Sequence, residues 1–120
     1  MDQWHLMQLA VDSSRGTPVV HVVGELTAVT GPRLLRLCDT VLARSAAGSL
    51  TVDLSGVRHF EPEGVAVLAR VRERCADTGT ALVLGGIADR RGALPLRVEQ
   101  ALDDIDGPST IDAGPVLAGG

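Results

Sequence analysis

The alternation of hydrophobic and polar positions is clearest over residues 50–75, and the other elements can be placed around this stretch. Apolar residues alternate with polar ones from Leu50 to Leu54, a period of two that predicts a strand with one buried face. Gly56 then favours a turn. We therefore expect the strand to stop near Ser55.

From Gly64 onward the apolar residues recur every three and four positions, which is typical of an amphipathic helix. Its predicted buried face consists of Val65, Leu68, Val71 and Cys75. Pro62 suits the first helical position because its φ is fixed and its missing N–H needs no partner there, and Glu61 is a candidate cap. The predicted loop over residues 57–63 thus leads into a helix N-terminus at the carboxyl end of a strand. Sites of open α/β sheets gather at such places.

Two short apolar runs before this stretch predict a pair of strands. The first covers residues 6–11 and the second residues 18–23, and the polar cluster over residues 13–16 is typical of a tight turn. Strands so close in sequence pair most simply as an antiparallel hairpin. The first strand should therefore lie at an edge of the sheet.

A second amphipathic helix follows the hairpin. Thr30 or Gly31 can cap it, and Pro32 can begin its first turn. One apolar stripe marks its buried side: Leu34, Leu37, Cys38, Val41 and Leu42. We expect this helix to end at residues 46–48.

The region after the central helix carries weaker signals. An apolar run over residues 81–84 predicts another strand, and residues 89–92 form a polar turn. Residues 95–105 show a helical stripe made of Leu96, Val98 or Glu99, Leu102 and Ile105. The segment 108–120 is rich in glycine and proline, so we expect a short strand over residues 109–111 and then a flexible tail.

Strands and helices that alternate through short connections imply right-handed crossovers and a mainly parallel sheet. The predicted fold class is therefore α/β, with a mainly parallel central sheet, an antiparallel edge strand and helices packed on the sheet. A chain of 120 residues is expected to form a single domain, here residues 1–107.

Composition argues against several classes of function. All the basic residues are arginine, the net charge is −4 and aromatic residues make up 2% of the chain, so both the charge and the stacking surfaces that nucleic acids require are scarce. No apolar run approaches the roughly 18 to 20 residues that cross a bilayer. Cys38 and Cys75 lie at apolar helix positions, which predicts reduced core residues of a cytoplasmic protein.

Candidate chemistry is sparse. His59, Glu61 and Glu63 lie close together in the predicted loop, but their spacing matches no metal site, and a solvated polar loop is the simpler interpretation. His21 stands among apolar neighbours and is interpreted as a partly buried structural residue. The chain has neither a Gly-x-Ser-x-Gly motif nor a phosphate-binding glycine loop. We therefore predict a protein that is not an enzyme and that needs no cofactor or metal.

Two motifs resemble a known family. The segment Val52–Val57 (Val-Asp-Leu-Ser-Gly-Val), followed by Gly64–Leu68 (Gly-Val-Ala-Val-Leu), is similar to the STAS domain of bacterial anti-sigma-factor antagonists. Val22–Leu26 (Val-Val-Gly-Glu-Leu) matches the family's second strand and its exit. The resemblance covers about residues 4–106 and implies the STAS fold.

In that family a serine after the Asp-Leu-Ser-Gly-Val motif is phosphorylated by a kinase that is also the anti-sigma factor, and the unphosphorylated antagonist binds this kinase. Carried over by position, the family's aspartate falls on Glu61, its phospho-acceptor serine on Pro62, its second serine on Glu63 and its glycine on Gly64. Proline has no hydroxyl group to accept a phosphate. The family's usual acidic residue after Gly-Glu-Leu is replaced by Thr27.

The resemblance implies a regulatory protein that binds a kinase-like anti-sigma factor and is not switched at the usual serine. The residues expected to contact the partner are Thr27, Arg58, His59, Glu61, Pro62, Glu63, Gly64, Val67 and Arg70. Two other functions remain open: a STAS subunit docked on an ATP-binding-cassette transporter, as in phospholipid import, and a domain that binds a small ligand. The oligomeric state, including a homodimer, is also left open.

Overall fold

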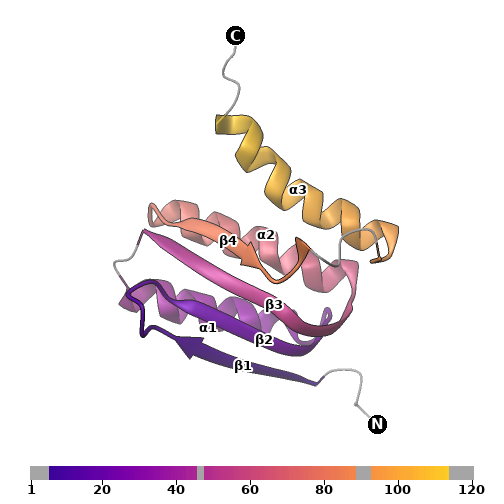
Figure 1. Ribbon diagram of the computed structural model, residues 1–120, viewed down its shortest axis with the longest axis horizontal. Coiled ribbons are helices and arrows are strands. Elements are labelled where there is room, and N and C mark those ends of the chain that lie inside the picture. Colours follow the sequence, from indigo (N-terminus) through magenta and orange to yellow (C-terminus); the bar gives the residue numbers. More distant parts are fainter. Residues whose placement is uncertain (1–5, 46–47, 89–92, 114–120) are drawn as a thin grey trace.

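The computed structural model describes residues 6–45, 48–88 and 93–113, which form a sheet with helices packed on one face (Figure 1). Its elements are β1 (Met7–Asp12), β2 (Val19–Leu26), α1 (Gly31–Arg44), β3 (Ser49–Phe60), α2 (Pro62–Asp77), β4 (Ala81–Gly85) and α3 (Leu96–Ala113). The four strands lie in the order β1-β2-β3-β4. β1 pairs antiparallel with β2, and the other pairings are parallel. The predicted fold class, with its antiparallel edge strand, is confirmed.

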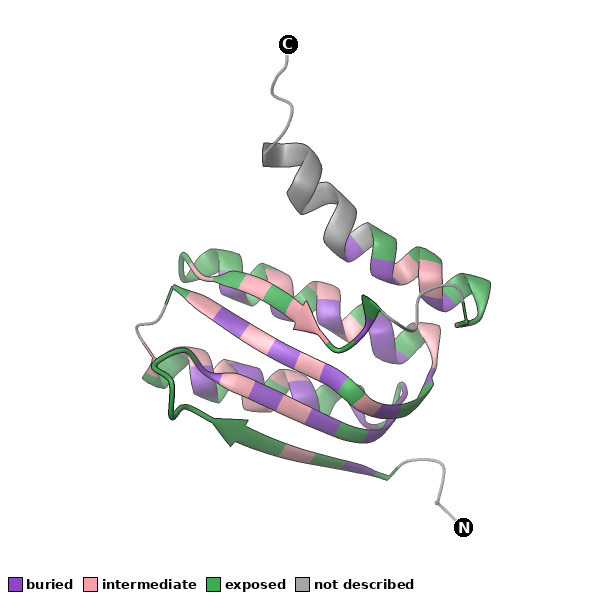
Figure 2. Ribbon diagram, viewed as in Figure 1, coloured by how far each residue is buried: buried purple, intermediate pink, exposed green. Residues whose placement is uncertain are grey.

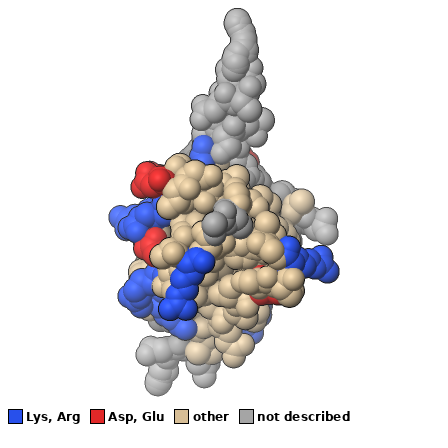
Figure 3. Space-filling view, turned by 90° about the vertical axis from the view of Figure 1, so that its left-hand side faces the viewer, with Lys and Arg blue, Asp and Glu red and all other residues tan. Residues whose placement is uncertain are grey.

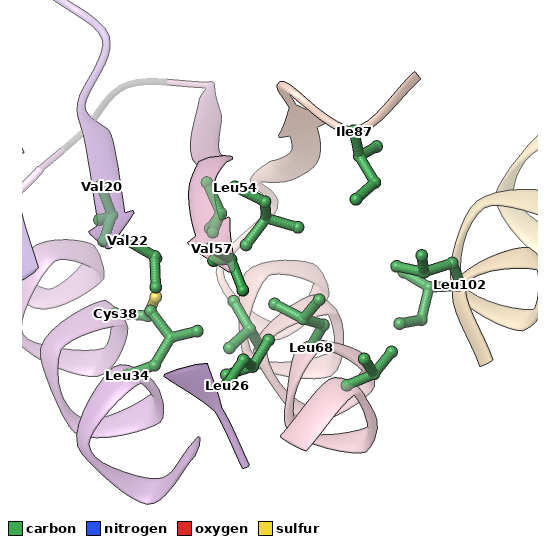
Figure 4. Packing of buried hydrophobic residues seen from close by; sticks show 14 of the residues in the cluster. Val20, Val22, Leu26, Leu34, Cys38, Leu54, Val57, Leu68, Ile87 and Leu102 are labelled. Carbon is green, nitrogen blue, oxygen red and sulfur yellow. The ribbon is translucent and has the colours of Figure 1, made fainter. Parts of the chain in front are cut away.

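The core lies between the sheet and the helices. Buried positions alternate with less buried ones along β2 and β3, as the period of two requires (Figure 2). Val22 of β2 points toward Leu34 and Cys38 of α1, and Leu68 of α2 lies below β3 (Figure 4). On the far side α3 packs on α2, where Arg72 donates a hydrogen bond to the Ile105 carbonyl oxygen at 2.9 Å.

The predicted buried faces of α1 and α2 agree with the structure, with two exceptions in α1. The four residues of the predicted buried face of α2 are all fully buried: Val65, Leu68, Val71 and Cys75. Leu42 of α1, expected on the buried stripe, is only partly buried. Leu37 of the same helix, also expected in the core, is only half-buried. It lines a groove with Val11 and Pro18 at the end of the β1–β2 hairpin, because the hairpin does not cover this flank of the helix.

The predicted end of the central strand is wrong. β3 does not stop near Ser55 but continues to Phe60, because β2 extends alongside it and Leu26 pairs with Phe60. Gly56 is no turn. A Cβ atom there would lie 2.8 Å from Cγ2 of Val23, so glycine permits the close approach of β2 and β3 at an irregular point of their register.

Further differences concern the ends of the helices. α1 ends at Arg44, before the predicted 46–48, and residues 46–47 lie outside the described part of the chain. The polar turn predicted over residues 89–92 also lies outside it. α3 continues through residues 109–111, where a strand was predicted, because this segment points away from the sheet, beyond the reach of the described strands (Figure 1).

Within α3, Val98, Leu102 and Ile105 are buried, whereas Leu96 is 71% exposed. The predicted stripe is therefore correct except for its first residue, which lies in the first helical turn. None of the helices described has the length and apolar character needed to cross a membrane.

Both cysteines are free and buried, as predicted. Burial raises the pKa of the Cys38 thiol to about 12, with a smaller contribution from the neighbouring Cys75. Burial also raises the pKa of Cys75. Neither thiol therefore has the thiolate character of a reactive cysteine.

Candidate functional site

β2 and β3 end at the same edge of the sheet, and α1 and α2 begin there, at the right of Figure 1. A single residue, Glu61, separates β3 from α2, and a short turn over residues 27–30 separates β2 from α1. The side chains that these junctions and the first turns of α2 expose form what we call the corner surface. It comprises Ala28, Val29, Arg58, His59, Glu61, Pro62, Glu63, Ala66, Val67 and Arg70.

Hydroxyl groups hold the turn between β2 and α1. The Thr30 hydroxyl donates to the Glu25 carbonyl oxygen at 2.7 Å and accepts from the Thr27 N–H at 2.9 Å. The Thr27 hydroxyl accepts from the N–H of Val29 at 3.1 Å. Thr27 is fully buried, so this predicted contact residue shapes the turn and does not reach the surface. Val29, which the sequence analysis did not single out, is 57% exposed.

The junction between β3 and α2 agrees with the prediction in position but not in its hydrogen bonds. Pro62 occupies the first helical position and Glu61 the cap position. The Glu61 side chain does not cap the helix. Its Oε1 accepts from the Ala28 N–H at 3.3 Å, which ties the two junctions together. His59 Nε2 lies 3.8 Å from the other oxygen of Glu61.

Two glycines bring the helix starts into direct contact. A Cβ atom on Gly64 would lie 2.3 Å from the carbonyl oxygen of Leu26, and one on Gly31 would lie 2.6 Å from Cγ2 of Val67. Gly64 is accordingly buried. It was predicted as a contact residue, but its place in the structure is that of a packing residue that fixes α2 against the end of β2.

Arg58 forms an ion pair that the sequence analysis missed. Its Nη2 donates to Oε2 of Glu25 at 2.9 Å, and Oε1 of Glu25 accepts from the Leu6 N–H at 2.8 Å. The Glu25 side chain is only 10% exposed, whereas that of Arg58 is 68% exposed. Both oxygens of the buried carboxylate thus have partners, and Glu25 joins the start of β1 to the end of β3.

A second polar pair lies on the sheet face away from the helices. His21 Nδ1 and Asp53 Oδ2 are 2.9 Å apart, and Asp53 Oδ1 accepts from the Ser55 N–H at 3.0 Å. The hydrogen bonds from Ser55, and secondarily His21, lower the pKa of Asp53. His21 is partly buried, as predicted.

The chemistry of the corner surface suits contact with a protein. It combines exposed apolar side chains with isolated positive and negative charges. The backbone that carries these side chains is closely packed. Among the described residues no three His, Cys, Asp or Glu side chains cluster in a way that could hold a metal ion. The opposite end of the molecule, at the left of Figure 1, carries arginine and acidic side chains around an uncharged surface (Figure 3).

The sequence matches the family described as "Mlab, STAS domain" over residues 9–94. An anti-sigma factor antagonist from Mycobacterium paratuberculosis is 28% identical, with 84% of this chain and 95% of that chain covered and a TM-score of 0.58. The STAS domain of an antisigma-factor antagonist from Rhodobacter sphaeroides is 15% identical, with 75% and 97% covered and a TM-score of 0.61.

The unphosphorylated form of the anti-sigma factor antagonist SpoIIAA is 16% identical, with 66% of this chain and 71% of that chain covered and a TM-score of 0.52. No curated protein sequence matches the chain.

Proposed function

This chain belongs to the STAS domain family, and on that basis we propose that it is a non-catalytic regulatory protein that binds a kinase-like anti-sigma factor through the corner surface. The observation that carries the proposal is the likeness to the Mycobacterium paratuberculosis antagonist, at 28% identity over most of both chains. The corner surface supports it, because this surface combines an exposed apolar residue, Val29, with the exposed charges of Glu63 and Arg70.

We further propose that the binding state is fixed by the sequence. Pro62 stands where the family's phospho-acceptor serine falls, and its ring is built into the first turn of α2. Glu63 beside it carries one negative charge, less than the roughly −1.5 to −2 of a phosphate. Two states are open: permanent binding of the anti-sigma factor, or imitation of the phosphorylated, non-binding form. We favour permanent binding, because an acidic side chain in a first helical turn is stabilising without any further role.

Charge reversal on α2 tests the corner surface. Glu63→Arg and Arg70→Glu each place the opposite charge at an exposed position, and we expect each to weaken binding of the purified anti-sigma factor about tenfold in calorimetric titration. Thermal stability should change by less than about 1 kcal/mol. Glu61 is not suitable for this test, because its carboxylate also holds the Ala28 N–H.

The matched control is Glu73→Arg, at an exposed position farther along the same helix. It should bind the anti-sigma factor as the wild type does. Unchanged affinity of both corner variants would place the interface elsewhere. A pulldown from the native cell that recovers transporter subunits in place of an anti-sigma factor would overturn the proposed function.

Phosphorylation tests the fixed binding state. Incubated with the anti-sigma kinase and ATP, the wild-type protein should remain unmodified at the corner, and Pro62→Ser should gain one phosphate, measured by intact mass. Phosphate on wild-type Ser55 would contradict the proposal. Glu63→Ser then separates the two states, because only a phosphate-imitating Glu63 predicts that the serine variant binds much more tightly.

A further inference from the structure

A groove of about 340 Å³ lies beside the corner surface, between β1 and β2. Its lining consists of Leu6, Met7, Gln8, Val23, Gly24 and Arg58. Val23 alternates with the helix-facing Val22, so it lies on the sheet face that α1 and α2 leave uncovered. Parallel strands are usually covered on both faces, which makes apolar groups on this face notable.

Gly24 allows the chain at the start of β1 to approach β2 closely at the groove. Its φ of +115° is one that other residues rarely adopt, and a Cβ atom there would lie 2.3 Å from the Leu6 carbonyl oxygen. Leu6, just before β1, therefore approaches the β2 backbone with no side chain between them. Leu6, 56% exposed, and Val23, 46% exposed, leave apolar surface in the groove beside this close contact.

Arg58 gives the groove a positive rim. Its side chain is 68% exposed, and its hydrogen bond to Glu25 uses one of the five N–H donors of the guanidinium group. Glu25 is the acidic group that faces Arg58. Each of its two carboxylate oxygens already accepts a hydrogen bond, one from Arg58 and one from the Leu6 N–H. A carboxylate from another molecule would thus find both charge and unused donors at the rim.

We propose that the groove binds an acidic–apolar segment of the same partner that the corner surface binds. An apolar side chain would lie between Leu6 and Val23, and an adjacent carboxylate would meet Arg58. The neighbours His59 and Glu61 belong to the corner surface, so one partner can cover both sites without a break. The inference rests on the proposed function and adds the chemistry of the partner to it.

The test compares two valines on the uncovered face of the sheet. Val23→Glu places a carboxylate in the groove, whereas Val83→Glu places one on β4, at the other edge of the sheet, where Val83 is equally exposed at 47%. We expect Val23→Glu to weaken binding of the purified anti-sigma factor by about tenfold or more, and Val83→Glu by less than about twofold. Circular dichroism melts check that both variants fold.

Glu63→Arg, measured beside them, separates this inference from the proposed function. If Glu63→Arg weakens binding and Val23→Glu does not, the proposal that the groove binds the partner is wrong, and the corner surface remains the proposed interface. If the anti-sigma factor does not bind the wild type at all, the proposed function itself is contradicted, whatever the groove variants show.

Photo-crosslinking supplies a readout that depends less on stability. A benzophenone side chain at position 23 should crosslink to the anti-sigma factor, one at position 83 should not, and the crosslinked peptide should carry an acidic residue beside an apolar one. A crosslink to a basic segment, or equal crosslinking at both positions, would overturn the inference.

Discussion

Leu68→Ala is expected to lower the free energy of unfolding by about 2 to 5 kcal/mol. Leu68 is fully buried in α2, below β3, so the change removes apolar contacts and leaves a cavity that the packed strands above it cannot fill. Urea unfolding followed by circular dichroism measures the loss.

The matched control is the same substitution at Leu96, which is 71% exposed in the first turn of α3. It should change the free energy of unfolding by less than about 0.5 kcal/mol. A loss well under about 1 kcal/mol for Leu68→Ala would mean that the buried face of α2 is placed wrongly.

Gly64→Ala should be about as damaging, although it adds only one methyl group. The new Cβ atom would lie 2.3 Å from the Leu26 carbonyl oxygen and 2.6 Å from the Thr27 nitrogen, both of them backbone atoms with no rotamer to change. We expect a loss of about 3 kcal/mol, at the upper end of the range for overpacking, and a matching fall in the melting temperature.

Gly48→Ala controls for the general effect of removing a glycine, because no atom lies within 4 Å of the Cβ position there. It should leave stability nearly unchanged. If Gly64→Ala melts as the wild type does, α2 can move away from β2 and the close contact at the corner is not required.

The faces of the helices could be predicted from the sequence because they depend on local periodicity. Val65, Leu68 and Val71 repeat at helical spacing, and whichever element packs against them must meet that stripe. The end of β3 depends on a partner instead. Gly56 favours a turn on local grounds, yet β2 runs alongside as far as Phe60 and continues the ladder through it.

The candidate site was predictable to the same extent. The junction of β3 and α2 lies where the motifs indicated, and Pro62 begins the helix there. Thr27 and Gly64 were expected at the surface, but a sequence does not distinguish a loop residue from one that packs at a crossing. Glu25 was missed because its partners, Arg58 and Leu6, are 33 and 19 residues away.

The contact of the two helix starts through Gly31 and Gly64 has a kinetic consequence. With the Glu61–Ala28 hydrogen bond across the same place, the two halves of the corner have little room to move separately. A preformed surface loses little conformational entropy when a partner docks. Variants of the corner that leave its charge unchanged should therefore differ mainly in how fast the complex dissociates, while their association rates stay close together.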